Sequence, residues 1–435
     1  MKTIELPAIV TELFDATAKE GCIIALLRPR FEGESIYDGD LDLTINPAHC
    51  DLFLQLAWRY LTSNGIDFSV IRVRQEKIRL EIFDPLIEKN IVLELWSCLQ
   101  VRKSSGFASL ILWENLSDFV CTDDTSLTGY RLHPDVEICY YLSHLLTKNK
   151  SITTPLVQKR INYYRELPGV SSEVLSLISQ ITTQDTLSLV GNTANARLHT
   201  LGVLKRSSLK ETLRRLPSKI SNLAFRLNLA RSKASAFLAF VGPDGVGKTT
   251  IIKSFSLIST QKSYYFKFKN SFRKSLLYRP LHLLYRGFLA FNRKEALLKN
   301  QIDERLALVL FLISALKMRI RSMLNILTKR VALADRSFSD FYISGARFPD
   351  MELDFNKTTY SLSWIAPPPR IIIHLNAPAD VIHQRKQELS TSQIDAYQRL
   401  TLLAYLKNPT EIYLSINTDK PIEKCMSSLK ALCND

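Results

Sequence analysis

Residues 242–249 read Gly-Pro-Asp-Gly-Val-Gly-Lys-Thr, and Thr250 follows. This stretch has the form G-x-x-x-x-G-K-[ST]. It lies between an apolar run, 236–241, and a run of helical character, 250–255. A strand, a glycine-rich turn and a helix start supply the structural context that a bare match to the pattern lacks. The sequence therefore predicts a loop whose backbone N–H groups point inward at a polyphosphate.

Each type of residue in this loop has a physical task. The glycines let the backbone curl, and the new helix adds its positive N-terminal end. We expect Lys248 to reach the β/γ-phosphates of ATP and the Thr249 hydroxyl to hold Mg²⁺. A chance glycine-rich turn is the alternative, and the strand and helix on either side argue against it. The predicted ATP-binding residues are Gly242, Asp244, Gly245, Val246, Gly247, Lys248, Thr249 and Thr250.

The bulk composition is that of a globular protein. The 435 residues are 46% apolar and 23% charged, and a chain of this length forms about two to three domains. No apolar stretch reaches a membrane-spanning length, since the nearest, 306–316, ends at Lys317. The first residues lack a signal-peptide core, and the seven cysteines include no C-x-x-C pair. We expect a cytoplasmic protein without disulfides or zinc.

The net charge of +15 is concentrated in one segment. Residues 201–300 contain 21 Lys or Arg and 3 Asp or Glu, so this segment carries +18 and the remainder −3. A solvated helical linker beside a nucleotide site explains the excess. Weak contact of 200–300 with an anionic membrane surface is a second reading. Nucleic acid is not favoured, because a recognition motif is lacking and aromatic interleaving is modest. The sequence is compatible with a homodimer and does not define the oligomeric state.

The C-terminal half reads as α/β. Strands are predicted at 237–241, 331–335, 370–375 and 411–416, with helices between them. The three later strands have no polar face, as a parallel sheet covered on both sides requires. A ligand is expected at the carboxyl ends of these strands.

Two further motifs place charged residues near the carboxyl ends of these strands. Asp335 and Arg336 follow the strand 331–335 directly. Asp335 is placed to hold Mg²⁺ directly or through water, and Arg336 to grip a second phosphate; a surface ion pair is the alternative. A later helix carries Arg385 and Lys386, which as lid cations would neutralise the charge on the transferring phosphoryl group. A basic helix face that is simply exposed to solvent is the alternative. We predict catalytic roles for Lys248, Asp335, Arg336 and Arg385.

The loop 242–250, the Asp335-Arg336 pair and the segment 375–388 occur in the order and spacing of thymidylate kinase-like proteins. The chain resembles a bacterial subgroup with a long N-terminal extension, often encoded beside surface-polysaccharide genes. The resemblance covers 234–435 well and the N-terminal half loosely. It implies a nucleoside-monophosphate-kinase fold and phosphoryl transfer from ATP, with Mg²⁺, to an acceptor such as dTMP.

The same resemblance implies residue roles. Asp244 would face the acceptor sugar, Asp335 and Arg336 would handle the metal and the acceptor phosphate, and Arg385 would be the lid arginine. The loop 417–421 corresponds to the loop that contacts the adenine in that family.

The acceptor side departs from that family. True thymidylate kinases usually carry a serine-rich run ending in Ala-Tyr-Gln after the aspartate–arginine pair, whereas 337–347 reads Ser-Phe-Ser-Asp-Phe-Tyr-Ile-Ser-Gly-Ala-Arg. Tyr342 and Arg347 could serve a different acceptor. Three functions therefore stay open. They are a thymidylate kinase-type phosphotransferase, a kinase for a sugar or lipid-linked acceptor in envelope assembly, and a non-catalytic ATP-binding regulator.

The N-terminal half resembles the nucleotidyltransferase fold. Asp40 and Asp42 lie two apart on a predicted strand, so both point to one face, and Glu94 lies on another strand. Three such carboxylates can clamp metal ions for nucleotidyl transfer. The upstream turn, 28–31, reads Arg-Pro-Arg-Phe where that fold has glycines. A fold retained for binding or regulation is the alternative.

Together these features predict four segments. A nucleotidyltransferase-like α+β domain spans 1–130, a helical extension 131–199 and a basic linker 200–233. A P-loop thymidylate kinase-like α/β domain, with a parallel sheet and flanking helices, spans 234–435.

Overall fold

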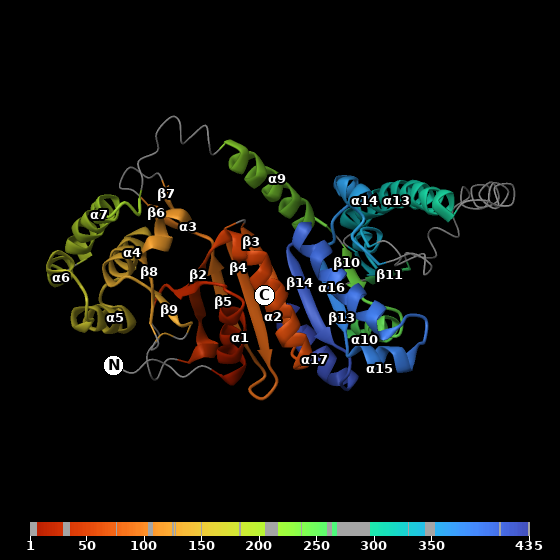
Figure 1. Ribbon diagram of the computed structural model, residues 1–435, viewed down its shortest axis with the longest axis horizontal. Helices are drawn as coiled ribbons and strands as arrows, with labels where there is room; N and C mark the ends of the chain where they lie inside the picture. Colours follow the sequence, from red (N-terminus) through yellow and green to blue (C-terminus); the bar gives the residue numbers. More distant parts are fainter. Residues whose placement is uncertain are drawn as a thin grey trace. The chain divides into compact units, whose positions relative to one another are not determined.

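The protein is mixed α/β, with a large and mostly parallel sheet and many helices (Figure 1). The computed structural model describes residues 7–28, 35–74, 76–102, 108–123, 126, 128–148, 150–181, 184–204, 216–235, 237–258, 263–267, 296–328, 330–343, 353–408 and 410–433. Part of the predicted basic linker (205–215), residues 268–295 and Arg347 lie outside these ranges.

The chain forms two compact units. The first comprises Met1–Tyr60, Val73–Glu81 and Ile91–Asn222, and the second Leu61–Arg72, Ile82–Asn90 and Leu223–Asp435. Two short pieces of the N-terminal half thus belong to the unit that contains the glycine-rich loop. The four-segment division expected from the sequence stays a prediction.

The second unit is built on a parallel sheet. Its strands lie in the order β11 (Ser263–Lys267), β12 (Val331–Asp335), β10 (Phe237–Val241), β13 (Ile371–Asn376) and β14 (Ile412–Asn417). The four strands predicted from the sequence are confirmed, with bounds that agree within one residue. β13 and β14 are buried at every residue, because helices cover both faces of such a sheet.

Two strands of this sheet were not foreseen as members of it. β11 lies parallel beside β12, and its sequence, Ser-Tyr-Tyr-Phe-Lys, read only as aromatic interleaving. β3 (Phe68–Arg74) comes from the N-terminal half and pairs antiparallel with β14, through residues 68–71. The pairing partners of both strands are distant in sequence, so no local pattern indicates them.

Helices and short 3₁₀ turns complete the second unit. α10 follows the glycine-rich loop and α17 packs on β14, both over a core that includes Val246, Ile373 and Leu414 (Figure 1). α16 begins with a capping box, in which Ser390 and Gln393 satisfy each other's backbone N–H groups. The bounds are α9 (Leu216–Lys233, mostly in this unit), α10 (Lys248–Ile258), α13 (Ala296–Leu327), η4 (Phe338–Phe341), α14 (Lys357–Ser361), η5 (Ser363–Ile365), α15 (Ala379–Arg385), α16 (Thr391–Lys407) and α17 (Ile422–Cys433).

The first unit combines a mixed sheet with helices. β2 (Asp40–Ile45) pairs antiparallel with β1 (Ile24–Leu26) and parallel with β5 (Lys89–Trp96). A separate antiparallel hairpin joins β6 and β7. The other α-helices and strands that lie wholly or mostly in this unit are α1 (Ala8–Lys19), α2 (Cys50–Ser63), β4 (Lys77–Asp84), β6 (Cys98–Arg102), β7 (Ala108–Leu112), α3 (Trp113–Leu116), β8 (Val120–Thr122), β9 (Tyr130–Leu132), α4 (Pro134–Thr147), α5 (Pro155–Glu166), α6 (Ser172–Ser179) and α7 (Gln184–Thr200).

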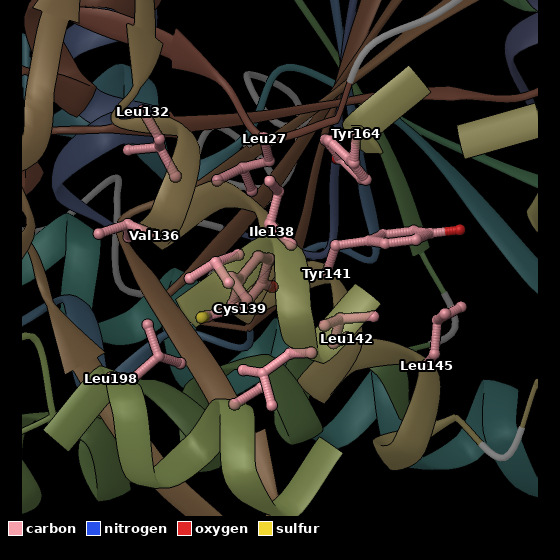
Figure 2. Packing of buried hydrophobic residues seen from close by; sticks show 14 of the residues in the cluster. Leu27, Leu132, Val136, Ile138, Cys139, Tyr141, Leu142, Leu145, Tyr164 and Leu198 are labelled. Atoms are coloured by element: carbon pink, nitrogen blue, oxygen red, sulfur yellow. The ribbon is translucent and has the colours of Figure 1, made fainter. Parts of the chain in front are cut away.

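α4 forms the centre of the first unit's core. Figure 2 shows Ile138, Tyr141 and Leu142 of α4 gathered with Leu27, which follows β1, and Leu198 of α7. α4, α5 and α6 lie within 131–199, the segment predicted as a helical extension. Within the described ranges, none of Cys22, Cys50, Cys98, Cys121, Cys139 and Cys425 forms a disulfide. None of the helices in those ranges combines the length and the apolar composition that crossing a membrane requires.

A buried carboxyl on α4 makes the stability of the first unit depend on pH. Burial raises the pKa of Glu137 to about 7, against the opposing effect of Arg131, whose Nη2 lies 3.0 Å from Glu137 Oε2. The raised pKa favours the neutral form in the folded state. This contribution to stability is therefore complete below the ordinary pKa of 4.5 and is lost as the pH rises through about 7.

We expect the wild type to lose about 2 kcal/mol more unfolding free energy than Glu137→Gln between about pH 5 and pH 8. Denaturant unfolding at both pH values measures the difference. Glu166→Gln, at an exposed site on α5, is the control. Equal pH profiles for the wild type and Glu137→Gln would contradict the expectation.

Candidate functional site

The glycine-rich loop adopts a backbone that only glycine permits. Gly242 has φ 137° and Gly245 has φ 94°, values that L-residues with side chains rarely adopt. A Cβ on Gly242 would lie 2.5 Å from the carbonyl oxygen of Leu375, and one on Gly245 would lie 2.9 Å from Lys386 Cβ. The loop therefore passes too close to β13 and to the end of α15 for any larger residue at these two positions.

A cavity of about 370 Å³ opens at the carboxyl ends of β10 and β12. This is the edge at which the sequence predicted a ligand. Of the predicted site residues, Gly242, Val246 and Arg385 do not line the cavity, and Val246 instead packs in the core. The lining residues are Asp244, Gly245, Gly247, Lys248, Thr249, Thr250, Asp335, Arg336 and Lys386.

Lys248 is held by the loop itself. Its Nζ donates to the carbonyl oxygens of Gly242 (2.8 Å) and Pro243 (2.7 Å), and lies 3.5 Å from Asp244 Oδ1. Burial, followed by repulsion from Arg336, lowers the pKa of Lys248 to about 8. An ammonium has three donors, so contact with a phosphate must replace at least one of these bonds. The lysine is already confined to the cavity that it is expected to serve.

Asp244 and Arg336, which are distant in sequence, form one network. Arg336 Nη2 lies 2.5 Å from Asp244 Oδ1, and its Nη1 donates to Asp340 (3.2 Å) and to the Tyr397 hydroxyl (2.9 Å). Burial alone would raise the pKa of Asp244, yet Arg336, Lys248 and Lys386 hold it well below its usual range. Arg336 also has φ 80°, unusual for a residue with a side chain. Its backbone N–H donates to the carbonyl oxygen of Phe240 at 2.8 Å. The guanidinium is thus fixed at the edge of the cavity.

Asp335 presents a buried oxygen that lacks a hydrogen-bond partner. The residue is 6% exposed, and its Oδ2 accepts from the Tyr265 hydroxyl at 3.2 Å, whereas its Oδ1 has no partner. A buried carboxylate oxygen without a donor is costly unless a cation or a water meets it. Thr249 lines the same cavity and can supply a hydroxyl ligand. Asp335 and Thr249 therefore fit Mg²⁺, which takes one or two protein ligands together with phosphate oxygens and waters.

Tyr265 is a candidate functional residue that the sequence analysis did not identify. Burial and the Asp335 carboxylate raise the pKa of Tyr265 to about 12, so its hydroxyl keeps its proton and donates; Thr249 is a second hydrogen-bond partner. Tyr265 thus positions both predicted metal-holding side chains. Its sequence context, an aromatic pair in a short strand, carried no signal for this role.

We expect Tyr265→Phe to weaken Mg²⁺ binding about tenfold, because residues that orient metal ligands typically contribute that much. The effect is measured by calorimetric titration of magnesium into the protein bound to a non-hydrolysable ATP analogue. Tyr360→Phe is the matched control, since that hydroxyl donates to the Lys407 carbonyl and Tyr360 does not line the cavity. Unchanged magnesium affinity in Tyr265→Phe would remove the positioning role.

The two predicted lid cations lie in different places. Lys386 lines the cavity, with its Nζ 3.7 Å from Asp244 Oδ2 and 2.9 Å from Glu388 Oε1. Arg385, the last residue of α15, donates instead to the Thr418 carbonyl (3.3 Å) and to Asp419 Oδ1 (3.4 Å). The structure therefore brings Lys386 to the cavity and Arg385 to the loop 417–421, which the family resemblance associates with the adenine.

The run after Arg336 does not place Tyr342 in the cavity. Tyr342 is buried, and its ring packs edge-on against Tyr360 at 5.9 Å between centroids. Tyr342 is therefore a buried residue that does not line this cavity. Arg347 lies outside the described residues.

Two of the three predicted N-terminal carboxylates, Asp42 and Glu94, lie next to a cation. β2 and β5 are neighbouring strands, and their parallel register sets Asp42 opposite Glu94. Asp42 forms an ion pair with Arg28, and Glu94 Oε1 lies 2.5 Å from Lys77 Nζ. Among the described residues, no group of three or more His, Cys, Asp or Glu side chains is placed to hold a metal ion. Asp40, Asp42 and Glu94 therefore do not form a metal clamp in the described structure.

Comparison with known proteins adds little to this geometry. No protein-family model matches the chain, and no curated protein matches it. Among solved structures, thymidylate kinase from Candida albicans is similar to part of it, at 16% sequence identity and a TM-score of 0.33. The match covers 46% of this chain and 91% of that chain. At such a score the likeness carries no argument about function.

Proposed function

We propose that the protein is an ATP- and Mg²⁺-dependent phosphotransferase of the thymidylate kinase type, acting on dTMP or a related phosphate-bearing acceptor. The single observation that carries the proposal is the buried Oδ1 of Asp335, which has no hydrogen-bond partner and belongs to the cavity that Lys248 and Thr249 also line. A polyphosphate cradle next to an unsatisfied carboxylate is the arrangement that a metal–nucleotide complex requires.

The protein's own residues supply distinct parts of this chemistry. Lys248 and the loop N–H groups would meet the β/γ-phosphates, and Thr249 with Asp335 would hold Mg²⁺, which neutralises phosphate charge when bound. Arg336 is immobilised by Asp244, Asp340 and Tyr397. A guanidinium fixed in this way can receive an acceptor phosphate without reorganising.

A second candidate is a kinase for a sugar or lipid-linked phosphate acceptor. It is favoured by the run after Arg336, which lacks the family's Ala-Tyr-Gln. A non-catalytic ATP-binding regulator is the remaining alternative. Cytoplasmic placement and a homodimer stay predictions.

The decisive experiment incubates the purified protein with ATP, Mg²⁺ and a panel of acceptors that includes dTMP, other nucleoside monophosphates and sugar phosphates. Consumption of dTMP with formation of dTDP supports the first candidate, and transfer only to a non-nucleotide acceptor supports the second. ATP binding without transfer to any acceptor, unaffected by Lys248→Ala, would favour the regulator.

Neighbouring cations offer a paired test of the site. We expect Lys386→Ala to lower turnover by about tenfold or more, because it removes a charge that lines the cavity. Arg385→Ala should instead weaken ATP binding and leave turnover nearly unchanged, because Arg385 contacts the loop 417–421. Steady-state kinetics separate kcat from KM in each variant, and a loss of kcat in Arg385→Ala alone would restore the lid role predicted from the sequence.

A further inference from the structure

One face of α13 exposes a row of large apolar side chains. The row comprises Val309, Leu312, Leu316, Ile320, Met323, Leu324 and Leu327, which are between 37% and 79% exposed. Most of these residues follow one another at intervals of three or four, so they share one face of the helix. We call these seven residues the apolar row.

The other side of α13 is the one that packs against its own unit. Ala315, Met318 and Ser322 are buried, and the helix contacts β12 and η4. Met318 follows Leu316 by two residues, a rotation of about 200°. A helix apolar on both faces is usually enclosed, yet this one presents its second apolar face to solvent.

Basic residues accompany the row. The chain from Arg305 to Ala334 contains no Asp or Glu. Lys317, which directly follows Leu316, is half-buried. Arg319, which directly precedes Ile320, is exposed. Arg319 lies near a further cation, Arg231 of α9. The basic residues of the segment are Arg305, Lys317, Arg319, Arg321, Lys329 and Arg330.

We propose that α13 docks on an anionic membrane surface, with the apolar row entering the headgroup boundary and Lys317 and Arg319 meeting lipid phosphates. An apolar face bordered by cations is the composition of helices that lie in the plane of a membrane. η5, which contacts α13, exposes Trp364 at 63%, and tryptophan favours the membrane–water interface. The proposal does not depend on the kinase assignment.

The charges favour an anionic lipid over a second copy of the chain. Two α13 helices paired along their apolar rows would bring Lys317 and Arg319 of one copy against those of the other. No carboxylate follows Glu304 on the helix to offset the repulsion. Like charges beside a helix seam oppose pairing, whereas the same charges strengthen attraction to anionic lipid.

Vesicle sedimentation with the full chain tests the proposal. In about 0.1 M salt we expect the wild type to partition into phosphatidylcholine vesicles that contain phosphatidylglycerol, and more weakly into phosphatidylcholine alone. Leu316→Gln combined with Ile320→Gln should lower the partition coefficient about tenfold or more. Lys317→Gln combined with Arg319→Gln should remove most of the preference for the anionic vesicles.

The matched control combines Leu86→Gln with Leu257→Gln, two leucines of the same unit that are 90% and 85% exposed and lie outside α13. It should bind as the wild type does. The proposal is overturned by an absence of partition into anionic vesicles, by equal partition into neutral ones, or by equal loss in row and control variants. A lipid-free dimer that Leu316→Gln with Ile320→Gln dissociates, seen by light scattering, would assign the row to a second copy.

Discussion

Lys248→Ala is expected to abolish phosphoryl transfer, with a fall in kcat/KM on the order of 10³-fold or more. Lys248 is 7% exposed and lines the cavity, and among the described residues the one other lysine that lines it is Lys386, which is more exposed. An alanine leaves the β/γ-phosphates without the cation that follows the charge during transfer. Initial rates with ATP, Mg²⁺ and the acceptor found in the panel measure the loss, and calorimetry measures ATP affinity.

The variant also removes the donor to the Gly242 and Pro243 carbonyl oxygens, so its fold must be checked. Circular dichroism and thermal unfolding should show a folded protein, since Lys248 lines an open cavity and water can take the place of its truncated side chain beside both carbonyls. Lys253→Ala, at an exposed site on the same helix, should retain wild-type rates. Transfer within a few-fold of the wild type in a folded Lys248→Ala would refute the phosphate role of the loop.

Asp335→Asn is the second large effect that we expect, with a fall in turnover of about 10²-fold or more. The amide keeps the shape of the side chain and can still accept from Tyr265, but it removes the charge that would hold Mg²⁺. ATP affinity measured with EDTA should stay unchanged or rise, because a carboxylate near the phosphates is lost. The magnesium concentration for half-maximal rate should increase strongly.

Asp380→Asn, at an exposed site on α15, controls for the loss of one negative charge in the same unit. It should keep both the rate and the magnesium dependence. A wild-type magnesium dependence in Asp335→Asn would mean that the Oδ1 without a partner meets water rather than a metal, and the proposal of a metal-dependent transferase would lose its main support.

The location of the site could be predicted from local sequence, but the contacts between its side chains could not. Lys248, Thr249 and Asp335 were identified because a glycine pattern and the end of an apolar strand are short-range signals. Tyr265 and Asp340 reach the same site through β11 and η4, and nothing in their neighbouring residues indicates this. Lys386 and Arg385 are adjacent, and only the end of α15 at Arg385 separates their directions.

The second unit shows the same division on a larger scale. The sequence by itself determined a glycine-rich turn between a strand and a helix, a buried parallel sheet, and a carboxylate and an arginine at the end of one strand, because each depends on residues near one another in the chain. Only the tertiary structure decided that β3 joins β14, that Tyr265 orients Asp335, and that Arg336 is fixed by Asp244. Those contacts join residues 70 or more positions apart, and their geometry follows from how the strands pair and pack rather than from any local preference.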